Sequence, residues 1–364
     1  MLIKNISNIV NNKIDCNMLN NSNYISTENM LENFGGIKDA SNVPSGKCTA
    51  ILTDDILLSN IRPYFKKLWF SKLDGGCSND VIALRVNNKL ALSKYVFYAL
   101  SSNKFFDVYV ANCKGTKMPR GNKDVLLNYD IPTKSLSEQQ HIVDTIGSVD
   151  DLIEKNEEII LKAHKLIDNI YLKETNTLEL VKISELDYFN ISKSGIKKFE
   201  NNKIYLDTSA VSDTKITDES YIIDYENRPS RANMQPKENT IWFAKLKDSP
   251  KYILVKNQKR LLENFVFSTG FMGLESEEYI VNYLYALILS TSFTNQKNLL
   301  SNGATMQGIN NEIFMNILVP NVDKTMAKLI GEKLENYVNL ICRLQEKNYK
   351  LKQIKETLLQ KYFG

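Results

Sequence analysis

Residues 142–170 read IVDTIGSVDDLIEKNEEIILKAHKLIDNI, and this stretch decides the fold. Its apolar residues recur in alternating steps of four and three, which is the a/d seam of a heptad repeat. The seam positions, interrupted by one amide, are Ile142, Ile146, Val149, Ile153, Asn156, Ile160, Ala163, Ile167 and Ile170. A seam sustained over four heptads predicts a long helix that pairs with another helix. We expect this helix at 137–174, with Ser137 as N-cap and Gln140 at the capping-box position.

A second seam occupies residues 322–364. Its positions are Ala327, Ile330, Leu334, Tyr337, Ile341, Leu344, Asn348, Leu351, Lys355 and Leu358. Residues 137–174 carry a net charge of −5 and residues 322–364 one of +4, which favours pairing between the two helices over self-pairing. In an antiparallel pair a positions face d positions, so Asn156 and Asn348 are predicted to meet and to set the coiled-coil register. The alternative is that both are amphipathic core helices of larger domains.

The chain also contains an internal repeat. Four short matches occur in the same order: Tyr24–Thr27 with Tyr205–Thr208, Gly115–Met118 with Gly303–Met306, Asn122 with Asn310, and Ile131-Pro132 with Val319-Pro320. Each copy has short β-like runs followed by a long helix. The sequence therefore predicts an α+β protein with two mixed globular domains, which we name the first head (1–136) and the second head (175–321). The helices at 137–174 and 322–364 would pair antiparallel and separate the two heads by a fixed distance.

Composition argues against catalysis by this chain. Its only histidines are His141 and His164, and its five cysteines have no CxxC spacing, so a metal site and a disulfide framework are not indicated. The sequence contains no phosphate-binding loop and no G-x-G dinucleotide fingerprint. No apolar run approaches the ~18 residues of a membrane span, and the N-terminus lacks the apolar core of a signal peptide. We therefore expect a cytoplasmic, non-catalytic chain that binds no metal and no cofactor of its own.

Charge and aromatic residues mark candidate DNA-binding positions in both heads. The first head has a net charge of +6, and its candidates are Arg62, Tyr64, Lys66, Lys67, Lys117, Arg120, Asn122 and Lys123. The second head has a net charge of −1, and its candidates are Arg228, Arg231, Lys245, Lys247 and the loop residues Thr305, Gln307 and Asn310, with a further basic run from Lys256 to Arg260. Lys and Arg suit phosphates, and Asn and Gln suit adenine edges. Different side chains in the same loop of a repeated frame predict that each head reads a different sequence.

Several motifs resemble the specificity (S) subunit of type I restriction-modification systems over essentially the full length. They are Asp55–Pro63, Gly76–Val81, Gly115–Pro119 and the stretch from Ile131-Pro132 to Val143. The most specific is Pro-x-x-x-Leu-x-Glu-Gln-Gln-x-Ile at Pro132–Ile142. The second copy departs from it, because Pro320–Met326 lacks Glu-Gln-Gln and Arg62-Pro63 has no counterpart at Lys245-Leu246.

The resemblance implies a DNA-reading role without catalysis. Each head would be a target recognition domain that reads one half of a bipartite site in double-stranded DNA. The two helices would be antiparallel spacers that relate the heads by a pseudo-two-fold axis, and their length would set the unread gap. Two modification (M) subunits would supply S-adenosylmethionine and methylate adenine N6, and restriction (R) subunits would add cleavage. The alternative function is a non-catalytic scaffold with two protein-interaction modules on a coiled-coil spacer, which would show no salt-dependent DNA affinity.

Overall fold

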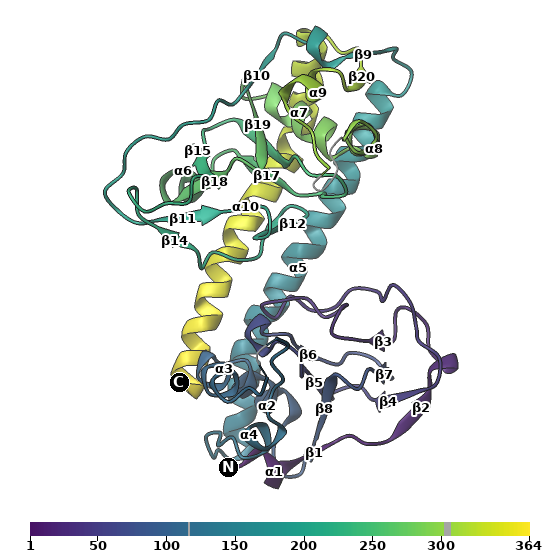
Figure 1. Ribbon diagram of the computed structural model, residues 1–364, viewed down its shortest axis with the longest axis vertical. Helices are drawn as coiled ribbons and strands as arrows, with labels where there is room; N and C mark the ends of the chain where they lie inside the picture. The colour runs from purple at the N-terminus through teal and green to yellow at the C-terminus, as the bar shows by residue number, and fades with distance from the viewer. Residues whose placement is uncertain (116, 302–306) are drawn as a thin grey trace. The chain divides into compact units, whose positions relative to one another are not determined.

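The computed structural model describes residues 1–115, 117–301 and 307–364 (Figure 1). The chain forms two compact units. Unit 1 contains residues 1–153 and 350–364, and unit 2 contains residues 154–349. Both units include segments of two 40-residue helices, α5 (Leu136–Thr175) and α10 (Lys324–Phe363). The predicted α+β class is confirmed, and each unit comprises one head together with parts of both long helices.

The start of α5 differs from the prediction. The Ser135 hydroxyl accepts a hydrogen bond from the Glu138 N–H (3.3 Å), and the Ser135 N–H donates to the Glu138 carboxylate (2.9 Å). This reciprocal pair is a capping box, so the assignment to Ser137 and Gln140 is wrong by two residues. The reason is that Ser135 and Glu138 also satisfy the Ser-x-x-Glu spacing, and a carboxylate binds the positive end of a helix better than an amide does.

The first head builds two four-stranded sheets. Its elements are α1 (Ile3–Ile6), β1 (Ser7–Ile9), β2 (Lys13–Asp15), η1 (Cys16–Met18), β3 (Tyr24–Ile25), β4 (Lys47–Ile51), β5 (Ile56–Ser59), η2 (Pro63–Phe65), β6 (Leu68–Phe70), β7 (Gly75–Cys77), β8 (Val81–Val86), α2 (Ser93–Leu100), α3 (Asn103–Ala111) and α4 (Lys123–Leu127). The strand orders are β1-β8-β5-β6 and β2-β4-β7-β3. One core cluster joins Leu58 of the first sheet, Tyr95 of α2 and Ile146 of α5, so α2 packs on both the sheet and the long helix.

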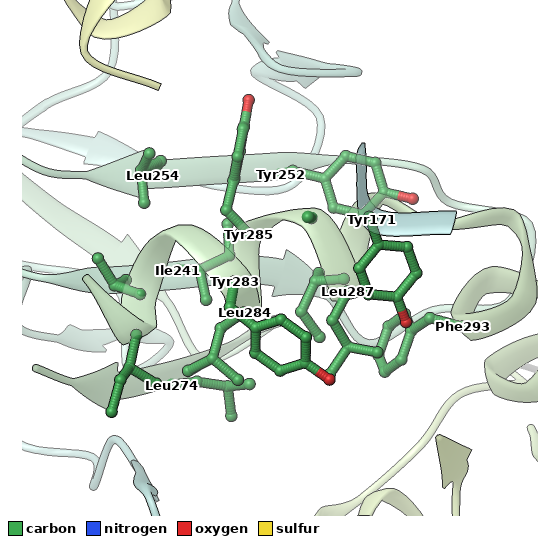
Figure 2. Packing of buried hydrophobic residues seen from close by; sticks show 14 of the residues in the cluster. Tyr171, Ile241, Tyr252, Leu254, Leu274, Tyr283, Leu284, Tyr285, Leu287 and Phe293 are labelled. Atoms are coloured by element: carbon green, nitrogen blue, oxygen red, sulfur yellow. The ribbon is translucent and has the colours of Figure 1, made fainter. Parts of the chain in front are cut away.

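The second head has a closely related set of elements. They are β9 (Leu180–Lys182), η3 (Ile183–Glu185), β10 (Phe189–Ile191), β11 (Lys203–Leu206), β12 (Val211–Ser212), β13 (Lys215–Ile216), β14 (Ile222–Ile223), β15 (Ala232–Met234), β16 (Thr240–Ala244), β17 (Tyr252–Val255), α6 (Lys259–Asn264), β18 (Phe265–Ser268), β19 (Phe271–Ser276), α7 (Ile280–Leu289), α8 (Thr291–Leu300), α9 (Asn311–Met315) and β20 (Leu318–Pro320). Helix α7 has the role of α2. Figure 2 shows its side chains in one cluster with the sheet and α5, and the rings of Tyr283 and Tyr171 lie 6.0 Å apart.

The strand orders confirm the internal repeat. The order β1-β8-β5-β6 in the first head corresponds to β10-β19-β16-β17 in the second. In the other sheet, β3 runs parallel to β7 just as β11 runs parallel to β18, which explains the match of Tyr24-Ile25 with Tyr205-Leu206. The heads differ at the edges of this sheet, because β2 adds beside β4 in the first head whereas β14 adds beside β11 in the second.

The two long helices run antiparallel within each unit. In unit 2 the Asn156 amide donates to the Asn348 side-chain carbonyl (2.7 Å), and Lys333 pairs with Glu174 (2.7 Å). In unit 1 Lys355 pairs with Asp150 (2.7 Å). Every predicted seam position is buried or half-buried, which confirms the heptad pattern. Both ion pairs join an acid of α5 to a base of α10, as the opposite net charges predict.

Replacing Asn156 with Ala is expected to lower the free energy of unfolding by about 1–2 kcal/mol, because it leaves the buried Asn348 amide without its partner. Urea unfolding of the purified chain measures this loss. Asn169→Ala removes an exposed amide from the same helix and is the matched control. Equal effects of the two substitutions would show that the amide pair contributes nothing.

His164 makes the stability of unit 2 sensitive to pH. Its Nε2 lies 2.7 Å from the Tyr285 hydroxyl, and burial lowers the pKa of His164 to about 4. The folded state therefore holds a neutral ring at pH values where the unfolded chain, with a histidine pKa near 6.5, binds a proton. Stability falls as pH decreases from about 6.5 towards 4, by about 2 kcal/mol at pH 5 relative to pH 7. Unfolding at both pH values checks this: His164→Gln should flatten the dependence, and the exposed His141→Gln should leave it intact.

Candidate nucleic-acid interface

In the first head, the loop after β5 crosses the loop before α4. The Arg62 N–H donates to the Pro119 carbonyl (2.8 Å), and the Gly121 N–H donates to the Asn60 carbonyl (2.9 Å). Two main-chain hydrogen bonds thus hold Asn60–Arg62 against Pro119–Gly121. We name these six residues the first loop crossing.

The second head contains an equivalent crossing. The Lys247 N–H donates to the Gln307 carbonyl (2.9 Å), and the Ile309 N–H donates to the Lys245 carbonyl (3.0 Å). Lys245–Lys247 and Gln307–Ile309 form the second loop crossing. In both heads, the loop predicted from the repeat is therefore paired with the loop that follows an inner strand of the sheet, β5 in the first head and β16 in the second.

This pairing corrects the alignment of the two copies. Arg62 corresponds to Lys247, so the counterpart of Arg62-Pro63 is Lys247-Asp248 and not Lys245-Leu246; the basic residue is kept and the proline is not. The segments between the matching parts of the two copies differ in length. The difference in residue number between equivalent residues therefore changes along the chain, and no sequence identity marks where it changes. After the crossings the copies agree again, since Asn122 caps α4 and Asn310 caps α9 through hydrogen bonds from the Asp124 and Ile313 N–H groups.

Exposed cations lie in the first loop crossing and in the residues beside it. Arg62, Lys117 and Lys123 are exposed, and so is the ring of Tyr64. Arg120 is exposed but forms an ion pair with Asp80 (2.9 Å). These residues remain candidates for DNA contact.

Two further candidates of the first head have partners within it. Lys66 donates to the Asn103 side chain (2.9 Å), and Lys67 donates to the Thr27 carbonyl (2.9 Å). Burial lowers the pKa of Lys67. Both lysines therefore tie together segments of the head around the loop after β5.

In the second head, two candidate DNA-binding cations, Arg231 and Lys245, lie close to each other. Arg231 is exposed and Lys245 is half-buried. Burial lowers the pKa of Lys245, and the nearby Arg231 charge lowers it further. Such a pair favours an anionic ligand. Arg228 donates to the Tyr225 carbonyl, and its guanidinium lies 4.1 Å from the Tyr225 ring centre.

The remaining candidates of the second head are polar or basic loop residues. Lys247, Gln307 and Asn310 are exposed. Thr305 lies outside the described residues, as do the other members of Asn302–Met306 and, in the first head, Thr116.

The basic run from Lys256 to Arg260 is not a DNA-binding patch. Lys256 is fully buried, and its ammonium donates to the Glu335 carboxylate (2.6 Å) and to the Asn282 side-chain carbonyl (3.0 Å). Arg260 pairs with Glu219 (2.7 Å) and stacks 3.7 Å from the Tyr349 ring centre. Three of the four partner residues follow more than 20 positions later in the chain, so the local sequence does not reveal that these charges are internal.

Sequence reasoning missed Lys297 of α8. It is buried, and its ammonium donates to the carbonyls of Ala244, Leu246 and Ser249 at 3.0–3.2 Å. Burial lowers the pKa of Lys297 to about 8. Lys297 thus holds the loop that carries Lys245 and Lys247 from beneath.

Gln139 was also missed as a structural residue. It is fully buried, accepts a hydrogen bond from the Leu92 N–H (2.8 Å) and donates to the Lys134 carbonyl (3.0 Å). The Glu-Gln-Gln motif therefore has two local functions, since Glu138 caps α5 and Gln139 joins α5 to the start of α2. The Glu-Gln-Gln motif is visible in the sequence, but what Glu138 and Gln139 contact becomes clear only from the fold.

Among the residues that the structure describes, no group of three or more His, Cys, Asp or Glu side chains is placed to hold a metal ion. None of the described helices combines the length and the apolar character that crossing a membrane requires.

The chain thus has two α+β heads of related strand order, each packed against parts of two long helices. Residues 4–163 match the family model of the type I restriction modification DNA specificity domain. The full chain resembles the specificity subunits of type I restriction enzymes.

Two curated relatives and one solved structure show the extent of the likeness. The type I restriction enzyme MjaVIII specificity subunit of Methanocaldococcus jannaschii is 23% identical over 376 residues, covering 92% of this chain and 84% of the relative. The EcoDI specificity subunit of Escherichia coli is 33% identical over 107 residues, or 28% of this chain and 23% of that one. The type I S subunit from M. genitalium shares the fold with a TM-score of 0.55 at 16% identity, covering 100% of this chain and 95% of that structure.

Proposed function

We propose that this chain is the DNA-binding specificity subunit of a type I restriction-modification complex, in which each head reads one half of a bipartite site. The observation that carries the proposal is the pair of loop crossings. The two heads share the main-chain frame but present different side chains at equivalent positions, Arg62 and Arg120 against Lys247 and Gly308. A common frame with different readers suits two different half-sites.

The chemistry would belong to partner subunits in the cytoplasm. Two M subunits would bind S-adenosylmethionine and methylate adenine N6, and R subunits would add restriction. This chain would contribute recognition and no catalysis. Ile159 and Leu166 support a helical partner, because they lie seven residues apart on α5 and stay 41% and 44% exposed. Packing against an M subunit would cover them.

Exchange of one head tests the function. The second head of a related specificity subunit replaces residues 175–321, and the M–S complex of each version is expressed in a host lacking other methylases. Methylome sequencing should show that one half of the methylated site changes and the other stays. A change in both halves, or no methylation by the wild-type complex, would contradict the proposal, and absence of salt-dependent DNA affinity would favour the scaffold function.

Lys117→Ala is expected to weaken binding of the M–S complex to its site by about 1–3 kcal/mol if Lys117 contacts a base edge. Fluorescence anisotropy with the cognate duplex and with a duplex altered in the first half-site measures affinity and discrimination together. Lys89→Ala removes another exposed cation of the same head and is the control. A lower salt dependence with unchanged discrimination would assign Lys117 to a phosphate instead.

A further inference from the structure

A cavity of about 340 Å³ in the second head has a strongly basic lining. Lys197, Lys198, Lys203 and Lys237 surround it together with Phe199. Its walls come from the loop after β10 and from the segment after β15. The Gly195 N–H donates to the Asn233 carbonyl (2.8 Å) and holds these two segments together.

Only two of the four lysines in this lysine pocket pair with an acid of the described chain, so the pocket keeps a positive charge. Lys198 pairs with Glu226 (3.4 Å) and Lys237 with Glu275 (2.7 Å), and the lysine of each pair is well exposed. Exposed pairs of this kind are weak and yield readily to a stronger anion. Within the part of the chain that the structure describes, Lys197 and Lys203 have no acidic side chain at ion-pair distance.

Aromatic rings hold the cations in place and extend the surface. The Lys203 ammonium lies 5.3 Å from the Phe199 ring centre, and that of Lys198 lies 5.9 Å from the Tyr225 ring centre. The two rings meet edge to face at 5.5 Å. Arg228 stacks on the far end at 4.1 Å from the Tyr225 ring, so a candidate DNA-binding residue continues the same array.

This surface belongs to the second head alone. In the first head, the segment that follows β1 forms β2 and pairs with β4. In the second head, the segment that follows β10 forms the lysine-bearing loop up to β11. The pocket therefore lies where the two copies diverge, which is the place for a contact that serves one half-site.

We propose that the lysine pocket is an anion site that binds a phosphate of the DNA backbone beside the half-site read by the second head. This inference rests on the proposed function and adds a backbone contact to it. Convergent ammonium groups neutralise phosphates without reading bases, and they position a protein on the duplex. The contact would also account for DNA binding by a head whose net charge is −1.

The test uses the full chain in its M–S complex and a short duplex with the methylated site. Binding is measured by anisotropy between 50 and 200 mM salt for the wild type, Lys197→Gln/Lys203→Gln and Lys197→Arg/Lys203→Arg. The control Lys182→Gln/Lys259→Gln removes two other exposed lysines of the same head. Loss of this phosphate contact should make the decline of affinity over this salt range about three- to fourfold smaller for the Gln pair. The Arg pair and the control should keep the wild-type decline, and discrimination between sequences should stay unchanged.

The outcomes separate the two proposals. A wild-type complex without salt-dependent DNA affinity would overturn the proposed function. A wild-type complex that binds, with a Gln pair that keeps the wild-type salt dependence, would overturn only the lysine pocket. Equal losses in the Gln pair and in the control would assign the effect to overall charge and would also overturn the pocket. Equal weakening with single-stranded DNA as the probe would reassign the surface to single strands.

Discussion

Glu335→Ala is expected to lower the free energy of unfolding by about 3–5 kcal/mol, more than any other substitution discussed here, because it leaves a buried ammonium without its counter-charge. Lys256 is fully buried and donates to Glu335, which also accepts from the amides of Asn282 (2.6 Å) and Asn339 (2.7 Å). Burial raises the pKa of Glu335, but the hydrogen bonds from Lys256 and the two amides outweigh it, so the pKa lies below its ordinary value. The stabilisation is therefore present above the unfolded-state carboxyl pKa and is lost as pH falls through the lower folded-state pKa.

Denaturant unfolding at neutral pH measures the loss. Glu332→Ala removes an exposed carboxylate from the same helix and should change stability by less than about 0.5 kcal/mol. The pair Lys256→Met/Glu335→Leu removes both charges and should recover part of the loss, because no buried charge is left uncompensated; the remainder reflects the hydrogen bonds that the buried Asn282 side chain loses. A single substitution as mild as the control would show that Lys256 reaches water in solution.

Lys297→Met is expected to damage both stability and DNA recognition by the second head. Three carbonyls of the loop Ala244–Ser249 lose their shared donor, at a cost of about 2–4 kcal/mol. The loop carries Lys245 and Lys247, so we expect about tenfold weaker binding to the cognate duplex, equivalent to about 1.4 kcal/mol.

A merely structural role for Lys297 would lower stability and leave half-site discrimination intact. The decisive measurement is therefore discrimination at each half-site by the M–S complex at a temperature where the variant is folded. Relaxed discrimination at the second half-site with normal discrimination at the first supports a positioning role. Lys182→Met, an exposed lysine of the same head, is the control and should change neither property.

The sequence predicted the parts of the fold that repeat regularly. The heptad seams predicted that Asn156 faces Asn348, and the structure joins the two side chains by a hydrogen bond. The prediction was possible because periodicity fixes which residues of a helix face its partner. The repeat predicted two equivalent heads, since short matches in constant order survive where strands and caps need particular residues. That Asn156 and Asn348 set the register of the helix pair stays a prediction until the unfolding measurements are made.

The local chemistry of the site was less accessible. Whether a lysine faces water or a buried acid depends on residues far along the chain, as Lys256 and Glu335 show. The correspondence of Arg62 with Lys247 depends on main-chain hydrogen bonds, which leave no mark on side-chain identity. Lys297 resembles any lysine on an amphipathic helix until the three carbonyls above it are known.

The loop crossings have a consequence for how such a protein changes over time. Main-chain atoms alone form the hydrogen bonds between Asn60–Arg62 and Pro119–Gly121, and likewise in the second head. An exposed side chain such as Arg62 or Lys247 can therefore be exchanged without breaking those bonds. If the crossings read DNA as proposed, mutations there would explore new recognition at little cost to folding. Because each head has its own crossing, one half of the recognised site could then drift while the other is conserved.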